Sequence, residues 1–515
     1  MAIEYDDVIV GSGSAGAAVA ARLSEDPARR VMLLEAGPHF ASMADIPGDI
    51  RNGSVMSLTG HDWGYYAEIA DGMGDDPRRQ VRLPRGKLTG GSSAVGATIF
   101  LRGTPDDFDE WVALGNDQWT WSDVLPYYRK LEDDLDFAGE VHGRGGPVPV
   151  RRWRPDELTP TQRAFRDVSL DAGWREAPDH NHPDASGVGP IPSNRREPTT
   201  RVSTAMAYLL PAQSRPNLTI AAGAHVDRVR VQGGRATGVT LVNGEEVRGR
   251  RVILSAGAIG SPSILLRSGI GPAGDLKRLG IDPILDRPGV GANLSDHPRT
   301  GVFMVPKPGT WQRSDPFVQV MTRTGSPVTG LTNDLQYFMV GHFDLTLFPD
   351  LLALSGTDVI LGVCVGHQKP NARGRMTLTS ADPHAAPHID LDFLSDEQDY
   401  DVLVDGVRRC WELAWCSPLR DFGEHPVVLN EDAMAIEDMV RIYIKVSLDS
   451  TYHPVGTARM GRADDSNAVV DQQCRVHGVD GLWVADASVM PTIVRANTNF
   501  TAIAIGERVA DWLRM

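Results

Sequence analysis

The 515-residue chain has few cysteines and no long apolar run. Its four cysteines are scattered through the last third of the sequence (Cys364, Cys410, Cys416, Cys474). This excludes a disulfide framework, and without a CxxC or Cys/His cluster no metal site is expected. No apolar run reaches the ~18 residues that a membrane span needs. A strand begins by residue 5, so we expect no signal peptide and, by default, a cytoplasmic protein.

The sequence also lacks a basic excess. It has 67 acidic residues against 51 Lys and Arg, a net charge of −16. Nucleic acids and anionic membranes are bound by basic surfaces, so neither is expected as a partner. A small-molecule substrate is the remaining expectation, and the composition leaves the oligomeric state open. The length exceeds what one hydrophobic core supports, which indicates two domains.

Glycine is abundant, with 53 residues, and it gathers in a few segments. The first is YDDVIVGSGSAGAAVAARLSEDPARRVMLLEAG, residues 5–37, in which a strand, a Gly-rich turn, an Ala-rich helix and a second strand follow in order. This is the pattern of a βαβ dinucleotide site: Gly11 permits the turn, Gly13 lets backbone amides approach a pyrophosphate, and Gly16 allows close packing. Glu35, at the end of the second strand, is placed to accept a hydrogen bond from a ribose hydroxyl. The alternative is a Gly-rich turn in an ordinary α/β protein.

Three further segments rich in small residues lie at 84–98, 255–262 and 481–488. One extended cofactor touched by all of them would explain the pattern, and FAD has the right size. A nicotinamide enzyme commonly carries only one such segment. Asp486 follows an apolar strand, where a carboxylate suits a cofactor hydroxyl. A turn-capping aspartate is the alternative.

Two polar residues near the C-terminus are candidates for catalysis. His453 lies in TYHPVGTARMG, whose apolar surroundings would keep its imidazole neutral and available as a base. Any one of fourteen histidines is more often structural. Asn499 offers a donor and an acceptor at the start of the last predicted helix, where a plain helix cap is the alternative.

The order of predicted elements indicates an α/β fold: a Rossmann-like FAD-binding domain with an inserted α+β substrate domain built on an antiparallel sheet. We assign 1–155, 195–297 and 451–515 to the first domain, and 156–194 and 298–450 to the second. Residues 38–84 are predicted as a long connection without regular structure that covers a site. A helical pattern runs from Phe108 to about Asp136. Four aromatics could line an apolar or aryl pocket, although core packing is favoured for any one of them: Trp63, Phe100, Phe338 and Phe348.

Six blocks together resemble the glucose–methanol–choline (GMC) oxidoreductase family of flavoenzymes. They stand in the family's order and span nearly the whole chain, and the second and third resemble its two signature patterns. Among members, the sequence looks closest to bacterial alcohol and hydroxymethylfurfural-type oxidases. The blocks are VIVGSGSAGAAVAARLSEDPARRVMLLEAG, PRGKLTGGSSAVGATIFLRGTPDDFDEW, GAIGSPSILLRSGIGP, RPGVGANLSDH, TYHPVGTARMG and GLWVADASVMPTIVRANTNFTAIAIGE.

The resemblance implies oxidation of an alcohol, foremost a primary one such as an aryl or other small hydroxymethyl compound, to the aldehyde. Hydride would pass to flavin N5 with His453 as base, and the second partner is placed on Asn499 rather than Asn497. The electron acceptor would be oxygen or another oxidant. Val95 stands where some members attach FAD through a histidine, so non-covalent FAD is implied, and Gly96 replaces the family's usual asparagine. The implied cofactor-binding residues are Gly11, Gly13, Ser14, Ala15, Gly16, Glu35, Ala36, Arg85, Gly91, Ser92, Gly96, Ala97, Val226, Ala256, Asp486, Ala487 and Thr498.

Three other functions stay open at this point. A redox-silent lyase would share the fold and the flavin without oxidising an alcohol. An NAD(P)-dependent dehydrogenase would use the first glycine motif, although the other three segments argue against it. A non-catalytic flavin-binding protein is disfavoured by the His453 and Asn499 candidates.

Overall fold

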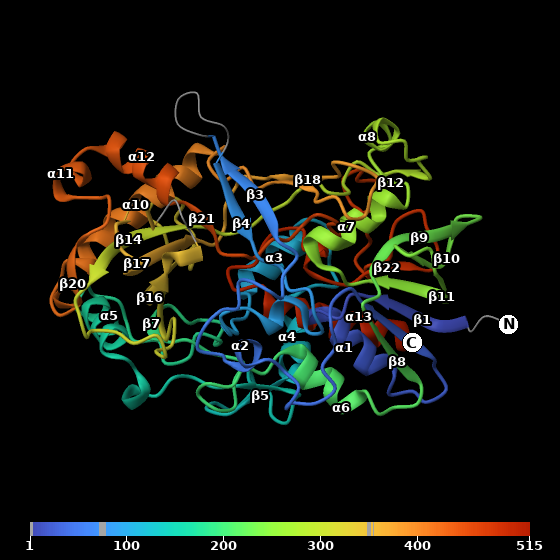
Figure 1. Cartoon of the computed structure of the whole chain (residues 1–515), viewed down its shortest axis with the longest axis horizontal. Helices are drawn as coiled ribbons and strands as arrows, with labels where there is room; N and C mark the ends of the chain where they lie inside the picture. The colour runs from blue at the N-terminus through green and yellow to red at the C-terminus, as the bar shows by residue number, and fades with distance from the viewer. Residues whose placement is uncertain (1–3, 72–78, 348–351, 354) are drawn as a thin grey trace.

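A computed structural model describes residues 4–71, 79–347, 352–353 and 355–515. Two large sheets lie toward opposite ends of the long axis, and both termini lie at the end that holds β1 (Figure 1). The expected α/β fold, with an inserted part built on an antiparallel sheet, is confirmed. The domain boundaries stay a prediction.

The first sheet has a parallel core of apolar strands buried on both faces. Val8, Ile9 and Leu33 are completely buried there, as expected when helices cover both sides of a parallel sheet. Its long strand β11 pairs with β1, β10 and β22 along different parts of its length. The strands, in spatial order, are β8 (Leu218–Ala222), β2 (Val31–Glu35), β1 (Glu4–Val10), β11 (Glu246–Leu254), β10 (Arg235–Leu241) and β9 (Val226–Gln232), with β22 (Leu482–Val484) beside β11.

Helix α1 (Ser14–Leu23) and helix α13 (Asn499–Arg514) cross closely against this sheet. A Cβ on Gly506 would lie 2.6 Å from the carbonyl oxygen of Ala15, so only glycine permits this approach. The crossing brings the first residue of α13, near the end of the chain, beside the Gly-rich turn near the start of the chain.

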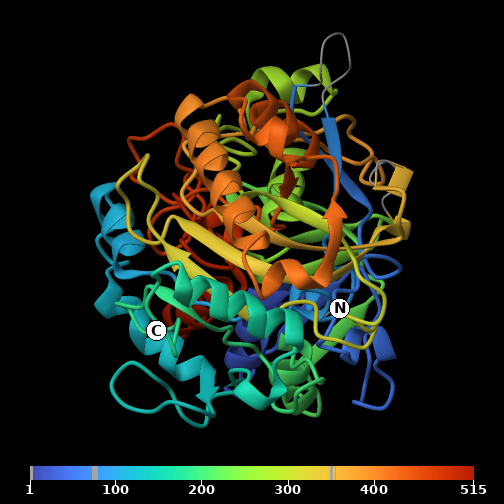
Figure 2. The ribbon, with the colours of Figure 1, turned by 90° about the vertical axis from the view of Figure 1, so that its left-hand side faces the viewer.

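The second sheet is antiparallel and is covered on its outer side by helices. Helices α10 (Glu397–Ala414) and α5 (Pro160–Asp171) pack on it and face the viewer in Figure 2. From its edge strand β21 the chain continues directly to His453. The strands in order are β20 (Gly423–Pro426), β14 (Pro298–Pro306), β17 (Val359–His367), β16 (Leu335–Asp344), β15 (Val320–Thr324) and β7 (Gly187–Pro190), with β21 (Asp449–Ser450) beside β14.

The segment 38–84 departs from the expectation of an irregular connection. It contains helix α2 (Gly48–Arg51) and an antiparallel hairpin, which β19 and β18 extend into a four-stranded sheet. The alternation of apolar and polar residues in the two strands of the hairpin is short, and the strands that complete the sheet lie some 300 residues away in the chain. The local sequence pattern therefore does not reveal this sheet. The strands are β3 (Tyr65–Ala70), β4 (Arg79–Leu83), β19 (His388–Asp390) and β18 (Arg375–Thr377).

The helical pattern from Phe108 to Asp136 is two helices instead of one, α3 (Pro105–Ala113) and α4 (Trp121–Leu131). Gly115, with φ +91°, ends the first, and Thr120 caps the second by accepting a hydrogen bond from the Asp123 amide. In the part of the chain that the structure describes, no helix is both long and apolar enough to cross a membrane.

Candidate active site

One cavity of about 650 Å³ lies between the two large sheets. All four Gly-rich segments line it from the side of the first sheet, and Gln336 and Phe338 of β16 line it from the second. Every residue proposed for the site from the sequence lies in its wall except Gly16. A Cβ on Gly16 would lie 2.0 Å from the carbonyl oxygen of Gly11, so its part is to let α1 pack on the turn.

Backbone atoms of three glycine-containing turns meet at one end of the cavity. Gly11 has φ +95°, and a Cβ there would lie 2.5 Å from the carbonyl oxygen of Ser255. Gly91 has φ +50°, and its Cβ would lie 2.7 Å from the Cα of Gly13. Side chains are excluded at these points, so bare backbone faces the cavity. Such a surface suits a long, flat ligand with phosphates.

Glu35 lies in the cavity wall at the end of β2 and is 6% exposed. One carboxylate oxygen accepts hydrogen bonds from the Ser12 amide (3.0 Å) and hydroxyl (2.6 Å), and the other accepts one from the Gly37 amide (2.9 Å). Burial raises the pKa of this carboxyl. Glu35 therefore shapes the Gly-rich turn as well as facing the cavity. Ser12 was not singled out by the sequence, although it stands inside the motif.

Asp486 holds two of the other segments together. One oxygen accepts hydrogen bonds from the Gly257 amide (2.9 Å) and the Ser261 hydroxyl (2.5 Å), and the other accepts one from the Ser488 amide (2.8 Å). Ser488 belongs to the short turn that Asp486 caps. Asp486 thus both caps this turn and lies in the cavity wall.

Arg85 brings a positive charge to the same cavity. Its guanidinium donates to the carbonyl oxygen of Tyr452 at 2.5 Å and to that of Pro84 at 2.6 Å. Burial lowers the pKa of Arg85 to about 10, and the side chain stays charged at neutral pH. The contact with Tyr452 ties the 84–98 segment to the loop that carries His453.

The four aromatic candidates separate into three groups. Trp63 and Phe338 lie in the cavity wall. Phe100 is fully buried and stacks on Phe500, with ring centroids 4.0 Å apart, so it belongs to the core. Phe348 lies outside the described residues.

His453 contacts Asn497, and not Asn499, across the cavity wall. The Nε2 of His453 lies 3.1 Å from the amide nitrogen of Asn497. Both residues line the cavity, and the amide oxygen of Asn497 has no hydrogen-bond partner among the described residues. A buried polar atom without a partner costs free energy, so this oxygen is free for a bound molecule.

The expectation for Asn499 is corrected accordingly. Its amide oxygen accepts a hydrogen bond from the hydroxyl of Ser14 at 2.7 Å, where α13 crosses α1. Asn499 is the first residue of α13, whereas Asn497 lies in the irregular loop before it. The geometry turns only Asn497 toward the imidazole.

The environment of His453 keeps its imidazole neutral. Burial, followed by the positive charges of Arg85 and Arg299, lowers the pKa of His453 to about 3. At neutral pH the ring is therefore unprotonated. Its Nδ1 lies 3.0 Å from Nδ1 of a second histidine, His297, on the side away from Asn497. The sequence block RPGVGANLSDH contains His297, but nothing in that block distinguished it.

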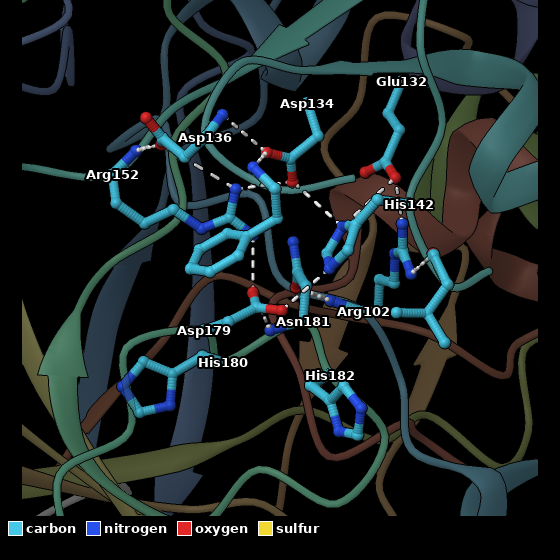
Figure 3. Close-up of polar contacts among 12 residues, drawn as sticks. Arg102, Glu132, Asp134, Asp136, His142, Arg152, Asp179, His180, Asn181 and His182 are labelled. Carbon is cyan, nitrogen blue, oxygen red and sulfur yellow. Dashed lines mark hydrogen bonds and ion pairs between the residues drawn. The ribbon is translucent and has the colours of Figure 1, made fainter. Parts of the chain in front are cut away.

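A separate polar cluster outside the cavity has the residues of a metal site but the charges of an ion-pair network. Glu132, Asp134 and His142 each offer one ligand atom, all within 4.8 Å of one another. Figure 3 shows Arg102 and Arg152 against these carboxylates, and Asp179 against His142.

Three carboxylates and two guanidinium groups are counted here: Glu132, Asp134 and Asp179 against Arg102 and Arg152. One negative charge remains, which a protonated His142 balances. Burial opposes that charge, but the close contacts with Asp134 (an ion pair, 3.0 Å) and Asp179 (a hydrogen bond, 2.8 Å) prevail and raise the pKa of His142 to about 10. Because cations already compensate these carboxylates, we assign the cluster to stability.

The cavity fits FAD on the observations above. Bare backbone at Gly11, Gly13 and Gly91 suits the pyrophosphate, Glu35 stands at the end of β2, and the walls of both sheets leave room for a flat ring system. Fold and site together define a class of protein, an oxidoreductase built around a dinucleotide cofactor of the flavin kind.

Comparison with known proteins names the family. Family models described as GMC oxidoreductase match residues 5–299 and 370–506. The chain is 36% identical to 5-(hydroxymethyl)furfural oxidase of Methylovorus sp. (strain MP688), covering 98% of each chain. It is 34% identical to oxygen-dependent choline dehydrogenase of Sinorhizobium medicae (strain WSM419), covering 99% of this chain and 95% of that one. The crystal structure of pyridoxine 4-oxidase from Mesorbium loti superposes with a TM-score of 0.89 at 30% identity, covering 99% of both chains.

The chain belongs to the GMC oxidoreductase family, whose members are FAD flavoproteins. It is an FAD-dependent oxidase or dehydrogenase that acts on CH–OH groups. The resemblance stated from the sequence is thereby confirmed. This membership also removes the reason to consider a nicotinamide enzyme.

Proposed function

We propose that the protein oxidises a primary alcohol to the aldehyde in this cavity, with His453 as the base and Asn497 as its partner. Aryl alcohols and other small hydroxymethyl compounds are the proposed substrates. The contact of His453 Nε2 with the Asn497 amide in the cavity wall carries the proposal. It supplies a neutral base and an amide donor side by side, as removal of a hydroxyl proton requires.

In this mechanism FAD supplies the acceptor for the carbinol hydride, at flavin N5. His453 takes the hydroxyl proton on Nε2 and becomes an imidazolium. The amide N–H of Asn497 orients the substrate oxygen and stabilises the negative charge that develops on it as the proton leaves. The positive charges of Arg85 and Arg299, which lower the pKa of His453, favour the same alkoxide charge. The alcohol thus loses one proton and one hydride and leaves as the aldehyde.

We propose that FAD is held without a covalent bond. Val95 lies in the cavity wall at the position where some family members carry a histidine for attachment, and its side chain has no atom that could form such a bond. The residues proposed to hold FAD are Gly11, Gly13, Ser14, Ala15, Glu35, Ala36, Arg85, Gly91, Ser92, Gly96, Ala97, Val226, Ala256, Asp486, Ala487 and Thr498. Denaturation should release all of the flavin into the supernatant.

The proposed substrate class is inferred from the side of the cavity wall that lies next to the second sheet. Met56, Phe317, Val318 and Phe338 make this wall apolar and partly aromatic, and Gln336 adds one amide. Such a wall suits a flat ring that carries one hydroxymethyl group. The relatives named for hydroxymethylfurfural and pyridoxine support this class. Oxygen or another oxidant would reoxidise the cofactor.

The proposal is tested by adding alcohols to the purified protein without oxygen and following the flavin absorbance. Benzyl alcohol and hydroxymethylfurfural should bleach the flavin, and choline should do so more slowly. Admitting oxygen, and in a second sample a dye, then shows which acceptor restores the colour. A flavin that no alcohol in the panel bleaches would support the lyase alternative and contradict the proposal.

We also keep the division into an FAD-binding domain (1–155, 195–297, 451–515) and a substrate domain (156–194, 298–450) as a proposal. The places of α5 and β7 against the second sheet support assigning 156–194 to the substrate domain. The cytoplasmic location likewise remains a prediction.

A further inference from the structure

A second histidine lies behind His453, outside the cavity. His297 immediately precedes β14 and is completely buried. Its Nδ1 lies 3.0 Å from Nδ1 of His453, and its Nε2 lies 3.1 Å from the carbonyl oxygen of Val494. Among the described residues that line the cavity His297 does not appear, so any effect it has on the reaction passes through His453.

The Val494 carbonyl determines where the protons of both rings lie. A carbonyl oxygen only accepts hydrogen bonds, so the Nε2 of His297 carries a hydrogen. Burial, followed by the nearby His453, His367 and Lys369, holds the pKa of His297 well below its usual range, and the ring is neutral. Its Nδ1 is then an acceptor, and Nδ1 of His453 must be the donor. The remaining nitrogen of His453, Nε2, then carries a lone pair, which the amide nitrogen of Asn497 faces at 3.1 Å.

The backbone fixes the same arrangement. One carboxylate oxygen of Asp296 accepts hydrogen bonds from the amide of His297 (2.7 Å) and from that of His453 (2.9 Å). The loop that carries the Val494 carbonyl is held by Asp107, which accepts from the Arg495 amide at 2.9 Å. Both rings are therefore attached to anchored backbone on either side of the hydrogen bond that joins them.

We propose that His297 is a positioning residue for the alcohol oxidation proposed above: it fixes the tautomer and the orientation of His453, so that Nε2 faces the substrate as an acceptor. In the opposite tautomer Nε2 would carry a hydrogen and could not take the hydroxyl proton. The bond partner of one ring nitrogen decides which nitrogen of a histidine is protonated. A carboxylate usually serves this purpose, whereas here the partner is a neutral imidazole.

The charged and titratable groups around the two rings are consistent with a neutral pair. Cations approach from several elements, and the nearest acid, Asp296, has its pKa raised to about 6 by burial. Besides Asp296, the titratable groups that act on the pair are Arg85 and Arg299 at His453, and His367 and Lys369 at His297. A protonated His297 would add a further buried cation near Lys369, which the site disfavours.

The test compares three substitutions in the flavin-loaded enzyme. His297→Leu removes the acceptor, His297→Asn keeps an acceptor oxygen near the position of Nδ1, and His180→Leu removes another buried histidine, which lies near Arg323. We expect H297L to lower kcat by ~10²–10⁴-fold with little change in KM or flavin content, and H297N to recover at least tenfold of this loss. The control H180L should leave kcat within about threefold, since it acts only on stability.

Non-additivity separates positioning from a general structural effect. In the His453→Ala background, H297L should cause almost no further loss of kcat, because the group it positions is already gone. An equal loss in both backgrounds, or an H297L enzyme as active as H180L, would overturn the proposal. If H453A itself turns over normally, the proposed function fails; if only H297L does, the function stands and this inference fails.

A measurement on the unaltered enzyme does not depend on whether the His297 variants fold. In protein labelled with ¹⁵N-histidine, the ring signals absent from the H453A spectrum belong to His453. They should show a protonated Nδ1 and an unprotonated Nε2 between pH 6 and 8. The reverse pattern would overturn the proposal.

Discussion

The Nε2 of His453 lies 3.1 Å from the side-chain nitrogen of Asn497, although the two residues come from separate loops of the chain. The loop of His453 leaves the antiparallel sheet at β21, and the loop of Asn497 leads into α13. Asn499, two residues further on, bonds instead to Ser14. This relationship assigns different consequences to the loss of the two asparagines.

Replacing Asn497 by Ala should lower kcat by ~10²-fold or more, since one donor to a developing oxyanion is commonly worth this much. The matched variant Asn499→Ala removes the bond to Ser14 and should change kcat by less than about fivefold. Steady-state kinetics with one alcohol, at equal flavin content, make the comparison. Similar kcat values for the two variants, or a larger loss for N499A, would show that the 3.1 Å contact is not the catalytic one.

Gly91→Ala should impair binding of FAD. Gly91 has φ +50°, and an added Cβ would lie 2.7 Å from the Cα of Gly13, so the two backbones that face the cavity must separate. We expect at least about tenfold weaker FAD binding, or about 1.4 kcal/mol. Gly48→Ala is the control, because Gly48 is not among the residues that line the cavity and an added Cβ there would meet nothing within 4 Å. The ratio of flavin to protein absorbance after dialysis measures both, and equal ratios would refute the prediction.

Acid should destabilise the protein in part through His180. Burial, followed by the charge of Arg323, lowers the pKa of His180 in the folded state to about 3. Between pH 6.5 and 3 the unfolded chain binds a proton that the folded chain does not, so the free energy of unfolding decreases as the pH falls. His180→Leu should remove up to about 1.4 kcal/mol per pH unit from that decrease. Urea unfolding at pH 6.5 and 4.5 tests this, and parallel pH dependences of wild type and variant would contradict it.

His142 should give the free energy of unfolding a pH dependence opposite to that of His180. Its pKa is raised to about 10 in the folded state, so its stabilisation is complete below pH 6.5 and is lost as the pH rises toward 10. His142→Gln should therefore lower the free energy of unfolding by about 2–4 kcal/mol at pH 6, and by clearly less at pH 9.5. Unfolding curves of both proteins at the two pH values provide the check. A deficit that is the same at both would mean that His142 is neutral in the fold.

The gathering of the Gly-rich segments at one site could be predicted from the sequence, because local backbone requirements restrict the residue type at fixed positions. Gly11 and Gly91 each need a positive φ and a close backbone approach, and both conditions select glycine at fixed positions in a motif. The strand and helix periods around them predicted the first sheet for the same reason.

The contacts proposed for catalysis could not be predicted in the same way. Asn497 and Asn499 are two residues apart, and only the irregular loop before α13 decides which of them turns toward His453. His297 depends on a hydrogen bond across 156 residues of sequence, and its block showed no feature beyond small residues. The hairpin of β3 and β4 was not predicted for a related reason, because strands distant in the sequence complete its sheet.

The most direct test of the account is reduction of the flavin by an alcohol in His453→Ala. The variant should keep its FAD, because His453 stands in the wall between the sheets while most of the proposed FAD contacts lie in the glycine-rich segments. Mixed with benzyl alcohol or hydroxymethylfurfural without oxygen in a stopped-flow instrument, it should bleach ~10²–10⁴-fold more slowly than the wild type. Bleaching at the wild-type rate, with FAD bound, would contradict the assignment of His453 as the base.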